Sequence, residues 1–142
     1  MVAARIVPWL VPLVVGCAAT PVRMAARAQP TTCTGAAVVD DRTVYDSADV
    51  SELPTLRAFP RLLYPSRLMS EGVNGSVLLS LIVLADGQVL PDSIRVVQAT
   101  NDGFIPNSLA FAKGLLYWPA CREGRPVAAR THQLVTYNVI RH

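Results

Sequence analysis

Two cysteines and two histidines are the residues in this sequence with the clearest capacity for metal chemistry. Cys33, Cys121, His132 and His142 all belong to types that bind metal ions. A structural zinc site draws its ligands from close spacings such as Cys-x-x-Cys or His-x-x-x-His. None of those spacings occurs among these residues. We therefore expect no metal site.

Motifs for catalysis and for phosphate binding are also missing. A serine nucleophile of the hydrolase type would lie in a G-x-S-x-G turn, which the sequence lacks. Gly72 and Gly75 are spaced as G-x-x-G, but no lysine followed by serine or threonine completes a phosphate loop. The sequence therefore predicts a protein that is not an enzyme and that needs no cofactor.

The first 28 residues have the composition of an export signal. Arg5 precedes an apolar run at residues 6–15, and small residues follow. Ala26-Arg27-Ala28 before Gln29 fits an ordinary signal-peptidase site. Residues 14–17 partly match a lipobox, in which Cys17 would become the lipidated first residue.

An uncleaved anchor is the third alternative for this segment. Pro8 and Pro12 disfavour a permanent membrane helix, because proline removes a backbone donor and clashes with the preceding turn. The sequence thus predicts export to the periplasm. It leaves open whether the chain is released, lipid-anchored at Cys17 or held in the membrane by its N-terminus.

The charge of the chain comes from this leader. Three of the 13 basic residues and none of the 10 acidic residues precede Gln29, so 10 basic and 10 acidic residues remain. A nucleic-acid-binding domain carries its basic patch in the folded part. We therefore expect no nucleic-acid partner.

Export also gives the remaining cysteines a simpler role. Apart from Cys17, the chain has only Cys33 and Cys121, and an even pair in an oxidising compartment favours a disulfide. That bond would close a loop of nearly ninety residues and stabilise the fold by roughly 3–5 kcal/mol in the chain-entropy model. Two separate buried thiols are the alternative.

A hairpin is the most distinct element that the sequence predicts. The apolar run at residues 77–85 is too short for a membrane helix, which needs about 20 residues. Its branched residues and its period of two favour a strand, with one set of side chains on one face: Val77, Leu79, Leu81 and Val83. Asp86-Gly87 favours a tight turn. The return strand is expected at residues 93–100.

Two helices and a third strand are expected around this hairpin. Residues 66–72 have helical composition for about two turns, with Gly72 as the stop. Residues 107–118 repeat apolar side chains at helical spacing (Leu109, Ala112, Leu115 and Leu116), and Pro119 is expected to end this helix. Residues 132–140 alternate as a strand whose inner face is Val135, Tyr137 and Val139.

These elements predict an α+β fold in the order helix, strand, strand, helix, strand. A small three-stranded antiparallel sheet would carry two helices on one face. We divide the chain into a signal at residues 1–28, a tether at 29–53 and one domain at 54–142. The tether has short branched patches that would also suit an extra edge strand.

Five short motifs in this order resemble the C-terminal domain of the TonB energy-transducer family. They are Tyr64-Pro65, Gly72-Val73-x-Gly75-x-Val77, Asp86-Gly87-x-Val89, Tyr117-Trp118-Pro119-Ala120 and Gly124-Arg125-Pro126-Val127. Each motif also has a local reason. Proline at the start of a helix presets its backbone, for example, and Gly75 admits a close backbone approach. The resemblance runs from about residue 54 to 140.

The resemblance implies a role in transport across the outer membrane, in which the domain transmits force derived from the proton gradient. Members of the family bind the periplasmic plug of outer-membrane receptors, and a short receptor segment pairs with the last strand by strand addition. Carried onto this chain, the binding edge consists of His132, Gln133, Leu134, Val135, Thr136, Tyr137, Asn138, Val139 and Ile140.

Two features of the sequence qualify that role. A full transducer has a stable membrane helix and a long proline-rich spacer, whereas the apolar run here is short and no such spacer follows it. We therefore expect a stand-alone periplasmic or lipid-anchored domain rather than a transmitter of force. An envelope scaffolding protein of the same fold, without energy coupling, is the alternative function.

The second face of the sheet is expected to be unusually apolar. Leu78, Ile82, Leu84, Val97 and Leu134 would lie on it, although a face without helices is normally polar. We expect residues 36–52 to cover it, held near the sheet by the Cys33–Cys121 bond. A second copy of the chain, forming a homodimer, is the next candidate.

Overall fold

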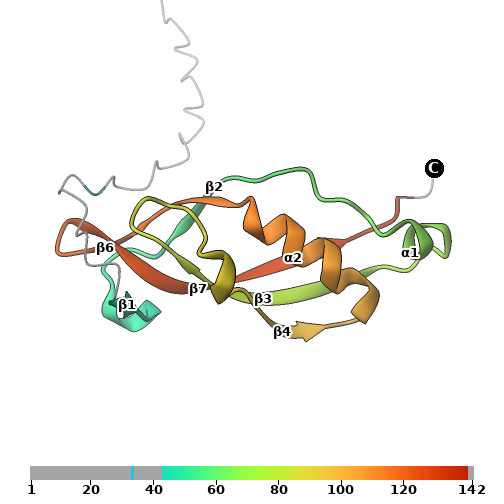
Figure 1. The fold of residues 1–142 in the computed structure, drawn as a ribbon, viewed down its shortest axis with the longest axis horizontal. Coiled ribbons are helices and arrows are strands. Elements are labelled where there is room, and N and C mark those ends of the chain that lie inside the picture. Colours follow the sequence, from blue (N-terminus) through green and yellow to red (C-terminus); the bar gives the residue numbers. More distant parts are fainter. Residues whose placement is uncertain (1–32, 34–42, 141–142) are drawn as a thin grey trace, which may run out of the picture.

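The computed structural model of the protein describes residue 33 and residues 43–140 (Figure 1). A five-stranded mixed sheet has the order β1-β7-β3-β4, with β6 paired to β7 off this path, and a separate ladder joins β2 to β5. One substantial helix, α2, lies against the sheet. The fold is therefore α+β, as the sequence predicts.

The central strand is β3, Gly75–Val83. Val77, Leu79, Leu81 and Val83 are all 0% exposed, so the face that the period-two pattern predicts is the core face. β3 pairs antiparallel with β4, Arg95–Ala99, on one side and with β7, Arg125–Tyr137, on the other. The predicted hairpin is confirmed.

The connection between β3 and β4 is longer than the predicted tight turn. Only Gly87 has a positive φ, 88°, and its N–H donates to the carbonyl of Leu84 at 2.9 Å. Val89 then bridges back to Val83, and a short 3-10 turn at Pro91–Ser93 precedes β4. The Asp-Gly sequence thus turns the chain, and the return strand starts several residues later.

The two helices are shorter than predicted. α1 covers Ser66–Ser70, and α2 covers Ile105–Lys113 and ends at Gly114 instead of continuing to Pro119. Gly114 is a weak helix residue, and a Cβ atom placed there would meet Pro60 Cγ at 2.9 Å. The helix therefore ends at a residue that is a weak helix former and that leaves room for Pro60.

The residues after Gly114 form a strand, which corrects the predicted second helix. β5, Leu116–Trp118, pairs antiparallel with β2, Thr55–Ala58. Leu115 is 1% exposed and Leu116 is 42% exposed, so the side chains alternate as in a strand. Aromatic residues such as Tyr117 and Trp118 favour a strand over a helix.

The sheet has more strands than the predicted three. β6, Ala120–Arg122, forms a hairpin with the start of β7 around Glu123 and Gly124, whose φ values are 51° and 74°. Two consecutive positive φ values define a turn type that suits a two-residue hairpin. β1, Val44–Tyr45, adds the N-terminal edge strand that the sequence allowed, and it runs parallel to β7.

Aromatic side chains fill the end of the core nearest α1. The rings of Phe104 and Tyr137 stack with centroids 4.4 Å apart, and Tyr64 meets both rings edge-on. A Cβ atom at Gly75 would collide with the Thr100 hydroxyl and the Phe104 ring. Gly75 is therefore approached closely by side chains and not by a backbone as predicted, and its missing side chain lets the aromatic cluster lie directly against the first residue of β3.

The second face of the sheet is more open than predicted. Val97 is 54% exposed and Leu134 is 56% exposed, whereas Leu78 and Ile82 are half-buried. Residues 43–52 do not cover this face, because Tyr45 and Val50 pack on Ala129 and its neighbours on the core side. Residues 36–42 lie outside the described part of the chain.

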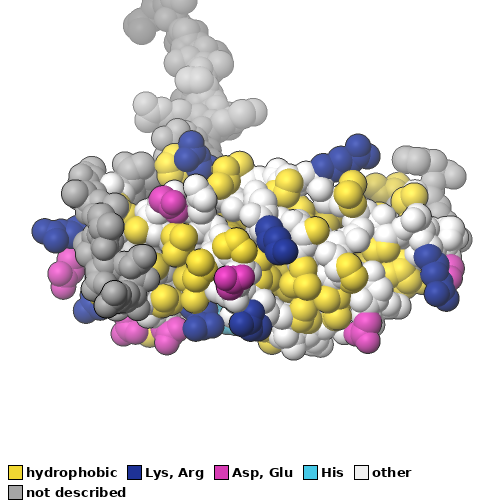
Figure 2. All heavy atoms as spheres, viewed as in Figure 1, with side chains coloured by type: hydrophobic (Ala, Val, Ile, Leu, Met, Phe, Trp, Pro, Cys, Tyr) yellow, Lys and Arg dark blue, Asp and Glu magenta, His cyan; other side chains and the backbone are white. Residues whose placement is uncertain are grey.

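The export signal, its cleavage site and Cys17 also lie outside the described residues. Among the helices that the structure describes, none combines the length and the apolar character needed to cross a membrane. Figure 2 shows basic and acidic side chains interspersed with apolar ones over one face of the molecule.

Candidate functional site

The candidate site is the outer edge of β7, on the side away from β3. β7 pairs with β3 in an unbroken register from Gly75↔Tyr137 to Val83↔Ala129. The strand is regular because its residues alternate between core and solvent. Val135 and Tyr137 are 3% and 1% exposed, while Leu134 and Thr136 are exposed. The predicted inner face at Val135 and Tyr137 is confirmed.

Hydrogen bonds on β3 determine which backbone groups of β7 face outward. Ser76 and Ile82 direct their N–H and C=O groups to the β4 side, where they bond to Thr100, Ser93 and Leu90. Backbone groups of alternate residues in a strand point to opposite sides. The odd-numbered residues of β3 therefore face β7 and bond to odd-numbered residues of β7.

The even-numbered residues of β7 must then direct their backbone groups away from β3. These are Arg130, His132, Leu134 and Thr136. Such a row of N–H and C=O groups is a template for one more strand. It spans about 25 Å from residue 130 to residue 137, at about 3.3 Å per residue.

Only the beginning of this outer edge is occupied in the described structure. β1 pairs there with Ala128 and Ala129. From residue 130 to 137, no strand of the described part of the chain pairs with the outer edge. We call residues 130–137 the open edge.

One side chain interacts with the backbone of the open edge. Gln133 donates from Nε2 to the carbonyl of Leu134 at 3.0 Å, and its Oε1 accepts from the Tyr117 hydroxyl at 2.7 Å. Burial raises the pKa of Tyr117 to about 12, so this phenol keeps the proton that it donates. Tyr117 thereby holds the amide of Gln133 in the orientation that covers one outward carbonyl.

The structure places the predicted site residues in two groups. His132, Gln133, Leu134, Val135, Thr136 and Tyr137 lie within β7. Asn138, Val139 and Ile140 lie beyond its end, where the N–H of Val139 donates to Asn74 Oδ1 at 2.7 Å and Ile140 is 77% exposed. The strand therefore ends earlier than predicted.

Sequence reasoning missed Arg130 and Thr131, which belong to the open edge, and the earlier start of the strand. Pro126 follows Arg125 and suggested a turn, but proline is compatible with a strand where its missing N–H is not needed. Residues 126–129 are apolar and all buried, so no alternation marked the start of the strand, and only Arg130 and Thr131 continue the period-two pattern of residues 132–137.

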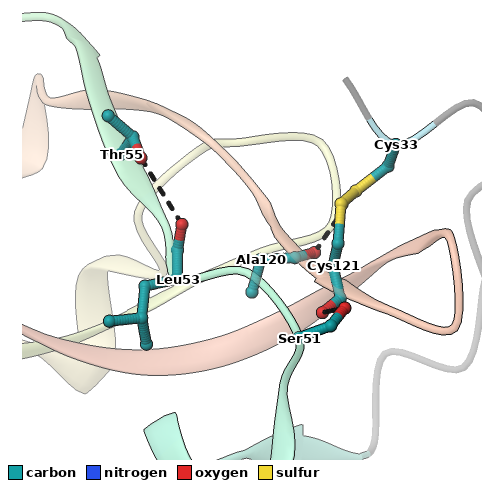
Figure 3. Close-up of a disulfide and its surroundings, with 6 residues drawn as sticks. All are labelled: Cys33, Ser51, Leu53, Thr55, Ala120 and Cys121. Carbon is teal, nitrogen blue, oxygen red and sulfur yellow. Dashed lines mark hydrogen bonds between the residues drawn. A yellow bond between two sulfur atoms is a disulfide. The ribbon is translucent and has the colours of Figure 1, made fainter. Parts of the chain in front are cut away.

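The structure joins Cys33 to Cys121 in a disulfide, with Cα atoms 6.0 Å apart (Figure 3). Cys121 belongs to β6 and is 4% exposed. The bond spans a sequence separation of 88 residues and attaches the N-terminal segment beside the start of β7. Within the described residues, no group of three or more His, Cys, Asp or Glu side chains could hold a metal ion.

Comparisons with known proteins agree with this architecture. A family model described as the Gram-negative bacterial TonB protein C-terminal matches residues 60–139. The solution structure of the Pseudomonas aeruginosa TonB C-terminal domain aligns with a TM-score of 0.52 and 17% identity, covering 69% of this chain and 96% of that chain. A search of curated proteins gave no match.

A second solved structure, the Helicobacter pylori TonB C-terminal domain, aligns less well. It gives a TM-score of 0.37 and 22% identity, and covers 57% of this chain and 72% of that chain. The family model describes a non-enzymatic domain of an energy-transducer type. The chain belongs to the TonB C-terminal family. Membership implies a place in the cell envelope and an interaction with TonB-dependent receptors in general.

Proposed function

We propose that this chain is an envelope module that binds an extended segment of an outer-membrane receptor by strand addition at the open edge. The observation that carries the proposal is the row of outward backbone groups at Arg130, His132, Leu134 and Thr136. A receptor segment would bond to these groups as a sixth strand, and main-chain hydrogen bonds would supply most of its affinity.

Side chains would contribute less to this recognition. His132, Leu134 and Thr136 are exposed on the second face of the sheet, where they would contact only the flanks of a bound peptide. Recognition through the backbone therefore tolerates replacement of these side chains, provided that each residue keeps its N–H group.

A proline at position 132 separates these two contributions. His132→Pro removes an outward N–H while leaving the inward bonds of Thr131 and Gln133 to β3, and proline is tolerated at strand edges. We expect His132→Pro to weaken receptor-peptide binding about tenfold or more, because one hydrogen bond contributes about 1 kcal/mol and the proline ring also excludes the neighbouring strand. His132→Ala keeps the N–H group, so it should change the affinity less than about threefold.

The measurement is a titration of the isotope-labelled full chain with synthetic peptides from the periplasmic N-terminal segments of outer-membrane receptors. Amide resonances of residues 130–137 should shift, and unchanged β3 resonances show that the variant is folded. Equal affinity for His132→Pro and the unmodified chain would contradict binding at this edge.

A scaffolding role is the second candidate, favoured by the exposure of Val97 and Leu134 on the second face. A copy of the chain would cover these side chains and form a homodimer. Sedimentation at micromolar concentration tests this role, because Leu134→Glu should abolish any dimer. A monomer at all concentrations would eliminate self-association through this face.

A further inference from the structure

The N-terminal segment is attached at both ends to one residue, Cys121. Cys33 reaches it through the disulfide. At the other end, the N–H groups of Ser51 and Glu52 donate to the Cys121 carbonyl at 2.8 and 3.2 Å, and the Cys121 N–H donates to the Glu52 carbonyl at 3.0 Å. Cys33 and residues 43–52 are thus both attached to Cys121, and we call this part of the chain the clasp; Figure 3 shows Cys33 and Ser51 beside Cys121.

Inside the clasp, β1 lies along the same outer edge that includes the open edge. Val44 pairs with Ala128 and Tyr45 with Ala129, in parallel. The ring of Tyr45 lies under the guanidinium of Arg122 at 4.6 Å, and its side chain packs with Val50 on the small cluster of Ala120, Val127 and Ala129. Cation–π contact and burial therefore hold β1 in one position.

The clasp leaves this edge where the open edge begins. Asp46 follows β1, and its Oδ1 lies 3.8 Å from Nε of Arg130. The chain then turns away through a 3-10 turn at Ser47–Asp49 and returns to Cys121. β1 therefore fills the start of the edge and ends beside the first open residue.

A strand added to a regular edge needs something to determine its register. Side chains repeat with period two, so a slip of two residues returns every side chain to the same face and costs little. The β7 edge is regular along its whole pairing with β3. The side chains of β7 that flank a bound segment would discriminate only weakly between registers that differ by two residues.

We propose that the clasp is a register stop for the receptor segment. β1 excludes the segment from Ala128 and Ala129, and the Arg130–Asp46 pair closes that end, so the segment is confined to residues 130–137. This inference rests on the proposed function, since it specifies how the same edge selects one alignment. The disulfide contributes by keeping β1 at high local concentration against a competing strand.

Two variants open the clasp in different ways. Cys33→Ser with Cys121→Ala removes the covalent end, and Tyr45→Pro disrupts the pairing of β1 while the disulfide remains, because the alternation of β7 turns the Tyr45 N–H toward β7. Arg67→Gln is the matched control, because Arg67 makes an exposed ion pair with Glu71 on α1, away from the clasp. Unchanged β3 resonances identify the variants that keep the sheet.

The experiment maps peptide contacts by isotope-edited nuclear Overhauser effects, with the full oxidised chain in neutral detergent and unlabelled receptor peptides. In the unmodified chain and in Arg67→Gln, contacts should be confined to residues 130–137 in a single register. In either clasp variant, a second set displaced by two residues should reach Ala128 and Ala129.

The outcomes separate the inference from the proposed function. If peptides contact the open edge in one register in every variant, the register stop is wrong and strand addition stands. If no peptide contacts residues 130–137 in the unmodified chain, the proposed function fails and the register stop fails with it. A second register in the clasp variants supports both.

Discussion

The two lateral edges of the main sheet differ although both strands pair with β3. β4 is five residues long, and its register with β3 shifts between Leu78 and Leu79. Arg95 folds back at its start and donates to the carbonyls of Asp92 and Ile94 at 2.8 and 2.9 Å. β7 pairs with β3 without any shift. Bulges and charges blunt an edge against added strands, so the β7 edge suits the strand addition that we propose better than the β4 edge does.

The contrast shows that exposure of apolar side chains does not distinguish the proposed binding edge from the β4 edge. Val97 on β4 and Leu134 on β7 are 54% and 56% exposed, which makes the two edges nearly equal by that measure. What differs is the regularity of the backbone. A substitution in β3 would disturb both edges together. It should therefore have the largest effect on stability of the changes that test this comparison.

Leu79→Ala should have the largest effect on the free energy of unfolding. Leu79 is 0% exposed and lies between both edges on the core face of β3. Truncating a buried leucine costs about 3–4 kcal/mol through lost burial and the cavity left behind. Urea unfolding measures the loss, and hydrogen exchange should show faster opening of β4 and β7 alike.

Leu134→Ala is the control for that prediction. Leu134 is 56% exposed, so its truncation should change the free energy of unfolding by less than about 1 kcal/mol. Equal losses of unfolding free energy for Leu79→Ala and Leu134→Ala would mean that Leu134 is covered in solution. A partner on the second face would then have to be included in the comparison of the two edges.

The sequence predicted the centre of the sheet better than its periphery. The alternation of β3 and the turn at Gly87 follow from local chemistry, and the structure confirms both. The five motifs of the family identified the fold, although one of them, Tyr117-Trp118-Pro119-Ala120, lies in β5 and β6 and not at a helix end. These signals need no knowledge of distant parts of the chain.

The strands that the sequence missed depend on contacts with distant residues. Leu116–Trp118 read as helix because its leucines have helical spacing, yet pairing with β2 some sixty residues earlier makes it a strand. β1 has only two residues and is held by Cys121, Arg122 and β7. No local pattern could have placed it parallel to β7 or shown where the open edge begins.

Alkaline pH should lower the free energy of unfolding through two buried tyrosines, Tyr117 on β5 and Tyr137 on β7. Burial raises the pKa of Tyr117 above its ordinary 10.0 to about 12, and burial also raises the pKa of Tyr137. Because the unfolded phenols ionise first, stability is complete below pH 10 and falls as the pH rises toward 12. Tyr117 accounts for a loss of up to about 2 kcal/mol.

Urea unfolding between pH 8 and 11 measures this effect, and Tyr117→Phe is the comparison. The variant loses the hydrogen bond to Gln133 at every pH, but its stability should fall less steeply above pH 10, with only the contribution of Tyr137 remaining. Parallel curves for the two proteins would show that the Tyr117 hydroxyl is accessible to water.

The smallest predicted effect concerns the Leu134 carbonyl, which points outward from β7 and already accepts a hydrogen bond from the Gln133 side chain. Gln133→Glu keeps an oxygen that accepts from Tyr117 but removes the Nε2 group that donates to the Leu134 carbonyl. That carbonyl becomes available to a receptor peptide, so affinity should rise about two- to fivefold, as expected for one hydrogen bond of about 0.5–1 kcal/mol.

The new carboxylate also adds a charge, and salt separates the two effects. A gain that persists at high ionic strength comes from the freed carbonyl, because screening suppresses the contribution of exposed charges. A substitution on β4, Gln98→Glu, changes the charge equally and should leave peptide affinity unchanged, since the bulged edge accepts no strand. Equal gains for Gln133→Glu and Gln98→Glu would mean that charge, not backbone regularity, distinguishes the two edges.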